Sequence, residues 1–182
     1  GCDLWVTDSK GRTPAHIAAA RNMAGCLHML GTSGYDIDST DDDDRTPCHD
    51  AAQNGHLSCL QLMADICKFN HLVLTEKDKY GRNVAHEAAE HGQKECLKFI
   101  LEDPAAFWIR DEQDVYLQTP AHVAALDDNW GCYHLLEEFG CDFELMDDRG
   151  YTAAEMVCYK EELRVGDDWF RDRRTSSADY EH

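Results

Sequence analysis

The chain has 182 residues, of which 43% are hydrophobic, and this length suits one packed domain or one repeat array. Acidic residues outnumber basic residues by 36 to 17, and the resulting net charge of −19 disfavours nucleic acid and anionic lipid as general partners. No apolar run approaches the roughly 20 residues of a membrane span, and no signal-peptide pattern is present. We therefore expect neither a nucleic-acid nor a membrane partner. Because the chain begins with Gly1 and not Met, we expect it to be a piece of a longer protein.

Cysteine usage indicates the compartment. The chain has nine cysteines, an odd number, and no two of them form a CxxC pair. This usage is typical of a reduced intracellular protein with buried thiols. We expect a cytoplasmic location, with the nucleus as the alternative.

One short pattern recurs along the chain. In its clearest copy, Thr46 can cap a helix that begins at Pro47, Gly55 and His56 end that helix, and a second apolar run continues to Met63. Aligned on the position of Thr46, called the Thr slot, the copies are Thr13-Pro14-Ala15-His16, Thr46-Pro47-Cys48-His49, Asn83-Val84-Ala85-His86, Thr119-Pro120-Ala121-His122 and Thr152-Ala153-Ala154-Glu155. Successive slots are 33, 37, 36 and 33 residues apart.

Other positions repeat with the Thr slot. Aspartate precedes it by five residues at Asp8, Asp41, Asp78, Asp114 and Asp147. Glycine precedes it by two residues at Gly11, Gly81 and Gly150, whereas Asp44 and Leu117 depart from this column. Cysteine follows it by thirteen residues at Cys26, Cys59, Cys96 and Cys132, where we expect small buried hydrophobes.

These columns resemble the ankyrin repeat, which has a period of about 33 and a T-P-L-H-x-A signature. The resemblance implies an all-α repeat solenoid of stacked helix-turn-helix units with projecting β-turn loops. It divides the chain into an array over residues 1–165 and a C-terminal cap with a polar tail over residues 166–182. The expected repeats are about 1–33, 34–69, 70–106, 107–139 and 140–165. Residues Gly1 to Leu4 resemble the end of a preceding repeat.

Three departures from the pattern predict local differences. Asn22-Met23 replaces the Gly-His pair, so we expect a less regular turn in the first repeat. Four extra residues fall near 66–75, where we expect a longer second helix or loop. Three more fall around 103–108, where Phe107 and Trp108 are expected to pack in the core, the alternative being that they are offered to a partner.

Candidate metal and catalytic groups have simpler explanations. The acidic stretch from Asp36 to Asp44 lacks the spacing of a calcium loop and suits a solvated turn. A zinc site formed by Cys48, His49, His56 and Cys59 would match no standard spacing. The histidines of the repeated slot are expected to make structural hydrogen bonds, as the resemblance implies. No catalytic motif appears, so we expect no enzyme activity, metal or cofactor.

The resemblance implies partner binding along the concave face, which the turn tips and first helices form. The residues expected there are Arg12, Arg21, Arg45, Gln53, Asn54, Tyr80, Arg82, His91, Tyr116, Gln118, Leu126, Tyr151 and Tyr159. Arginine and tyrosine are frequent interface anchors, and the arginines form a row with one residue per repeat.

We therefore expect a non-catalytic scaffold or adaptor, acting as a monomer. Its partner would be an extended or helical protein segment with apolar anchors and some acidic residues. The alternative is a regulatory segment of a larger enzyme or channel that acts on its own parent chain. A third possibility is a metal or redox sensor that uses the cysteines.

Overall fold

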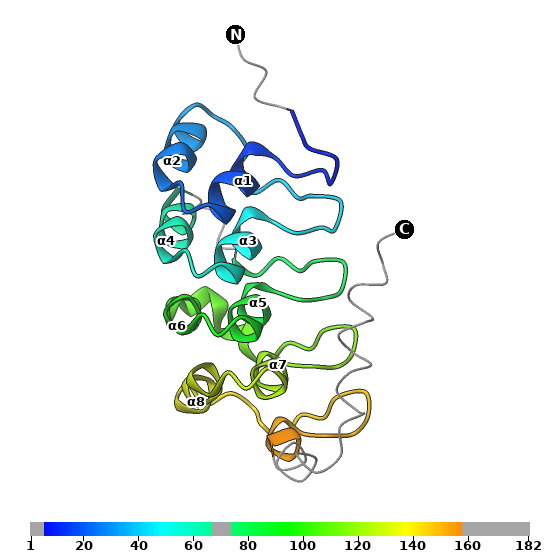
Figure 1. The fold of residues 1–182 in the computed structure, drawn as a ribbon. Helices are drawn as coiled ribbons and strands as arrows, with labels where there is room; N and C mark the ends of the chain where they lie inside the picture. The colour runs from blue at the N-terminus through cyan, green and yellow to red at the C-terminus, as the bar shows by residue number, and fades with distance from the viewer. Residues whose placement is uncertain (1–5, 67–73, 158–182) are drawn as a thin grey trace.

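The computed structural model describes residues 6–66 and 74–157. Helix pairs stack one below another, with the first helices in one column and the second helices in a parallel column (Figure 1). A loop projects from each repeat on the side away from the second helices. The expected all-α repeat solenoid is confirmed. Residues Gly1 to Leu4, Tyr159 and the expected cap and tail lie outside the described residues.

Corresponding helices of the repeats are nearly equal in length. The first helices are α1 (Pro14–Ala20), α3 (Pro47–Gln53), α5 (Val84–Glu90) and α7 (Pro120–Leu126). The second helices are α2 (Ala24–Thr32), α4 (Leu57–Ile66), α6 (Lys94–Glu102) and α8 (Trp130–Glu138). A 3-10 helix, η2 (Pro104–Asp111), follows α6, and a further helix starts at residue 153. None of the described helices has the length and apolar character needed to cross a membrane.

A buried histidine joins each repeat to the next. The backbone N–H of Thr13 donates to His16 Nδ1 at 3.2 Å, so the ring's other nitrogen carries the hydrogen and donates to the carbonyl of Arg45 at 2.8 Å. The same pair of bonds recurs at His49, His86 and His122, whose Nε2 atoms lie 3.2, 2.9 and 3.1 Å from carbonyls of Arg82, Gln118 and Tyr151. The expected structural role of this histidine is confirmed. We call this pair of bonds the histidine link.

The repeated aspartates shape the projecting turns. In the second turn, Asp41 Oδ1 accepts the backbone N–H groups of Asp43 and Arg45, each at 2.9 Å. In the other turns, the backbone N–H groups two and four residues later donate in the same way to Oδ1 of Asp8, Asp78, Asp114 and Asp147. Each turn also needs one left-handed residue, and the φ angles there are 73° at Gly11, 58° at Asp44, 75° at Gly81, 56° at Leu117 and 82° at Gly150. The aspartate column therefore has a structural purpose in every repeat.

Small and aliphatic side chains fill the space between repeats. The paired alanines of the first helices are buried and allow these helices to approach closely, and the second helices contribute four fully buried leucines, Leu27, Leu60, Leu97 and Leu136. Burial of each such leucine contributes roughly 2–3 kcal/mol. A helix pair of this length has no core of its own, so the interfaces between repeats provide most of the stability.

The cysteines at the repeated position belong to this core. Cys59, Cys96 and Cys132 are buried, whereas Cys26 is only half-buried. Burial raises the pKa of Cys96 and of Cys132 to about 11. These thiols are therefore protonated at neutral pH and are weak nucleophiles, which favours the core role over the redox sensor.

The prediction of a less regular turn in the first repeat is wrong. The turn at Asn22 is regular: its φ of 56° resembles the 73° of Gly55, and the N–H of Met23 bonds Ala18 as that of His56 bonds Ala51. Asparagine tolerates the left-handed region, so it replaces glycine without changing the turn.

The aromatic pair Phe107 and Trp108 is exposed, with Trp108 at 75% exposure, although the sequence predicts core packing. The three extra residues form part of η2, which buries Ile109 instead and turns its two aromatic neighbours outward. Arg110 covers the ring of Phe107 at 4.1 Å. Beside the earlier insertion, α4 has ten residues against nine in α6, and residues 67–73 lie outside the described part of the chain.

The histidine links predict an acid-sensitive fold. Burial lowers the pKa of His49 and of His86 to about 3 from 6.5. As the pH falls below about 6.5, these histidines bind protons in the unfolded chain but not in the folded one. The free energy of unfolding therefore falls between about pH 6.5 and pH 3, by at most about 1.4 kcal/mol per pH unit for each histidine. Urea unfolding of His86→Gln should show a lower stability at pH 7.5 but about 2 kcal/mol less decline between pH 7.5 and 5 than the unmodified chain.

His134 provides the control, because it lies exposed on α8 outside the links. The His134→Gln chain should follow the unmodified one at both pH values. An identical decline in the His86→Gln chain would contradict a neutral, buried His86.

Candidate partner-binding surface

Hydrogen bonds between neighbouring loops hold the turn tips in a row. The backbone N–H of Asp42 donates to the carbonyl of Lys10 at 3.1 Å, and that of Lys79 to Asp43 at 3.0 Å. Val115 donates to Tyr80 at 2.9 Å and Asp148 to Tyr116 at 3.0 Å in the same way. The tips therefore form one continuous edge, which Figure 1 shows on the side opposite α2, α4, α6 and α8. These bonds fix the position of each tip relative to its neighbours.

The arginine row divides into one exposed pair and one partly buried network. Arg12 lies near solvent, with 38% of its side chain exposed, and pairs with Asp8 at 2.8 Å. Arg45 is 19% exposed and reaches Glu87 at 3.2 Å, Gln53 at 2.9 Å and Asp50 at 3.4 Å. These contacts join the second turn to both α3 and α5.

Arg82 completes the network on α5. Its guanidinium pairs with Glu90 and lies 3.4 Å from Glu87, whose side chain is only 1% exposed. Burial opposes the charge of Arg45, but Glu87 and Asp50 outweigh this effect and raise the pKa of Arg45. Burial raises the pKa of Asp50, and Arg45 opposes that rise. Arg12, Arg45 and Arg82, the row expected to face a partner, thus contact carboxylates of their own chain.

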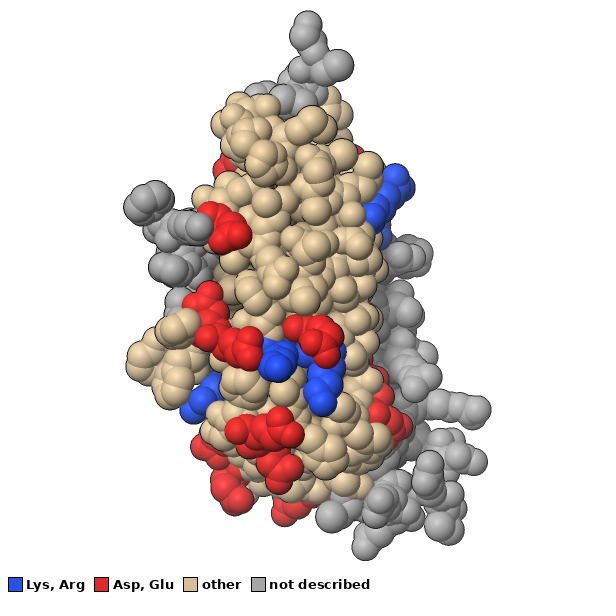
Figure 2. Space-filling model, turned by 90° about the vertical axis from the view of Figure 1, so that its left-hand side faces the viewer, with Lys and Arg blue, Asp and Glu red and all other residues tan. Residues whose placement is uncertain are grey.

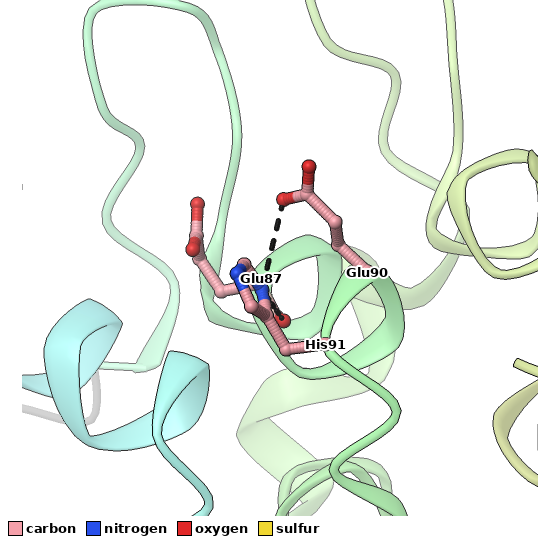
Figure 3. A group of neighbouring side chains, drawn as sticks. All are labelled: Glu87, Glu90 and His91. Carbon is pink, nitrogen blue, oxygen red and sulfur yellow. Dashed lines mark hydrogen bonds and ion pairs between the residues drawn. The ribbon is translucent and has the colours of Figure 1, made fainter. Parts of the chain in front are cut away.

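Glu87, Glu90 and His91 gather at the end of α5 (Figure 3). Among the described residues, these three form the group whose ligand atoms approach closely enough for a metal ion, all within 4.8 Å of one another. His91 Nδ1 lies 3.1 Å from the Glu87 carbonyl, and both carboxylates already contact Arg82. Because a cation would have to displace that guanidinium, the arrangement favours an ion-pair network.

The four side chains considered for zinc have separate contacts. Cys48 Sγ packs 3.8 Å from Met63 Sδ, and His49 forms a histidine link. His56 Nε2 bonds the carbonyl of Ala20 at 3.1 Å, and Cys59 is buried in the core. His49 and His56 thus join neighbouring repeats, and the two cysteines lie in the core.

The other expected binding residues differ in accessibility. Arg21 and Asn54 are exposed, whereas Leu126, Tyr80 and Tyr151 are half-buried. Gln53 Nε2 and His91 Nε2 lie 3.2 Å apart, so these two expected residues meet across α3 and α5. Gln118 is only 6% exposed, so its side chain lies inside the array and not on the face where the sequence places it.

The fourth turn tip carries an apolar patch that the sequence prediction only partly includes. Val115, Tyr116 and Leu117 are consecutive and exposed, and Met146 of the following turn is exposed beside them. Gln113 Nε2 joins the two turns by donating to the carbonyls of Leu117 at 2.7 Å and Met146 at 2.9 Å. We call Val115, Tyr116, Leu117 and Met146 the apolar tip; their exposure ranges from 43% to 57%.

Leu117 is the least expected member of the apolar tip. It has a φ of 56° in the column that three other repeats fill with glycine. A leucine in this left-handed conformation costs roughly 1–2 kcal/mol. In the sequence, the departure of Leu117 from the glycine column was the one sign of this patch. Met146 breaks no repeated column, so the sequence showed no sign of it. Strain at an exposed apolar residue suggests a role beyond stability.

The network around Glu87 predicts unequal costs for two arginines of the same column. Arg45→Ala removes a partly buried partner of Glu87 and Asp50, so the free energy of unfolding should fall by about 2 kcal/mol. Arg12→Ala removes an exposed pair and should cost less than about 1 kcal/mol. Urea unfolding at neutral pH measures both, and equal costs would contradict the network.

Comparison with known families agrees with this geometry. The family model described as ankyrin repeats (3 copies) matches residues 15–111, which is more than half of the chain. The matched segment extends from α1 to the end of η2 and contains three stacked helix pairs. A search of curated proteins finds no match. The chain belongs to the ankyrin-repeat family.

Proposed function

We propose that this chain is a non-catalytic scaffold or adaptor that binds a protein segment along the row of turn tips, with the apolar tip as the anchor. Ankyrin repeats mediate protein–protein interaction. The observation that carries the proposal is the exposed, left-handed Leu117 between Tyr116 and Met146. No other described tip presents consecutive large apolar residues.

The surroundings of the apolar tip favour binding. Backbone bonds to the tips on either side hold Val115 and Tyr116 in place, so little conformational entropy is lost when a partner binds. Tyrosine supplies a large contact area with a polar end, which suits an interface anchor. Leucine and methionine beside it extend the apolar area.

The partner's chemistry follows from what remains accessible. The arginines that suggested carboxylates in the partner already contact Asp50, Glu87 and Glu90. Apolar side chains are therefore the partner's main anchors, and acidic groups are secondary. We place this interaction in the cytoplasm, with the nucleus as the alternative, since the thiols of the core are free.

Paired substitutions test the proposal. Immobilised chain captures partners from a cell extract, mass spectrometry identifies them, and calorimetry measures the affinity of each purified partner. The variant Tyr116→Ser with Leu117→Gly should bind roughly 30-fold more weakly, because two anchors are lost. It should be no less stable than the unmodified chain, since glycine relieves the strain at position 117.

Trp108→Ser is the matched control, because Trp108 is an equally prominent exposed aromatic on η2, away from the tips. It should leave the affinity unchanged. Partners that bind the double variant as tightly as the unmodified chain would contradict the apolar tip as anchor.

A further inference from the structure

The peptide group between Leu117 and Gln118 is hydrogen-bonded on both sides. Gln113 Nε2 donates to the carbonyl of Leu117 at 2.7 Å, and the N–H of Gln118 donates to Asp114 Oδ1 at 2.9 Å. Every described turn has the bond to its aspartate, but only the fourth has a side-chain amide available for the carbonyl. At the position of Gln113, the other turns carry Thr7, Thr40, Lys77 and Met146.

Leu117 needs such support more than the corresponding residues of the other turns. Among the described residues, four that are not glycine have a positive φ, and three of these are asparagine or aspartate: Asn22, Asp44 and Asp128. Their short polar side chains can bond the nearby backbone, and so they tolerate the left-handed region. Leu117 has a φ of 56° and an apolar side chain that can form no such bond. Its conformation therefore depends on bonds that other residues supply.

The amide of Gln113 also holds the second turn of the apolar tip. Nε2 donates to the carbonyl of Met146 at 2.9 Å, so the two hydrogens of one amide serve carbonyls of two turns. The side chains of Leu117 and Met146 are 47% and 56% exposed. One half-buried glutamine thus connects two exposed apolar residues that lie 29 positions apart in the sequence.

We propose that Gln113 is a positioning residue of the apolar tip: it holds Leu117 and Met146 in the arrangement that a partner segment binds, without contacting that segment. This inference rests on the proposed function, since it concerns the same surface. When the amide is removed, Leu117 can leave its left-handed conformation. The apparent affinity then falls in proportion to the fraction of molecules that keep the tip in place.

Gln113→Glu tests this role, because a carboxylate of nearly the same size donates no hydrogen bond at neutral pH. NMR of the unmodified chain should show an intense NOE between the amide and α protons of Leu117, which lie close together at positive φ. In Gln113→Glu this NOE should weaken. The purified partners identified by mass spectrometry should bind about tenfold more weakly. Since the NOE needs no partner, an unchanged NOE would overturn the proposal by itself.

A double-variant cycle tests whether Gln113 acts through Leu117. Glycine adopts a positive φ without strain. In a Leu117→Gly chain, the further change Gln113→Glu should therefore alter the affinity by less than about threefold. A loss as large as in the unmodified chain would mean that Gln113 acts on the partner directly, and would overturn the positioning role.

Gln61→Glu is the matched control, because it makes the same substitution at an exposed residue of α4. Figure 2 shows the face that the second helices form, which lies on the side opposite the turn tips. This variant should leave both the NOE and the affinity unchanged.

The earlier variant, Tyr116→Ser with Leu117→Gly, separates this inference from the proposed function. Affinity that falls in that variant but not in Gln113→Glu would overturn the positioning role and leave the proposed function standing. Affinity that falls in neither would overturn both.

Discussion

The structure depends on the bond from a buried histidine to the carbonyl of the next repeat. Each histidine accepts a backbone N–H at the start of its own helix and donates to the next turn, so a single ring sets the helix start and the distance to the following repeat. This geometry requires a neutral ring, and burial favours the neutral form. Bonds between neighbouring tips then add a second connection on the outer edge. The apolar tip is positioned by these two connections.

A second level of organisation comes from charge. The arginines of the second and third turns neutralise carboxylates on α3 and α5, and Glu87 lies between both guanidinium groups. Several charged side chains in the centre of the array are therefore paired and partly buried. The apolar tip, η2 with Phe107 and Trp108, and the α1–α2 end are among the places where apolar side chains remain exposed on this acidic molecule. A strained turn at Leu117 holds the apolar tip.

Much of the architecture could be predicted from the sequence, because the repeated columns encode backbone geometry. The aspartate, glycine and histidine positions each satisfy a local bond or a left-handed φ, and such requirements recur at fixed spacing. Side-chain placement was harder to predict. Arg45 pairs with Glu87, 42 residues away, and nothing in the pattern indicates that contact in preference to a partner's carboxylate. Phe107 and Trp108 were predicted in the core but are exposed, because Ile109 takes the core position. Gln118 was predicted on the surface but is buried, because its column is exposed only in part.

Nitrogen-15 NMR of the histidine rings tests the central claim most directly. At pH 6, His49 and His86 should give the chemical shifts of neutral rings that carry hydrogen on Nε2, with no change on moving to pH 7.5. Slow exchange of those ring hydrogens with solvent should accompany the shifts. Rings that are half-protonated at pH 6, or that carry hydrogen on Nδ1, would contradict a stack built on histidine links.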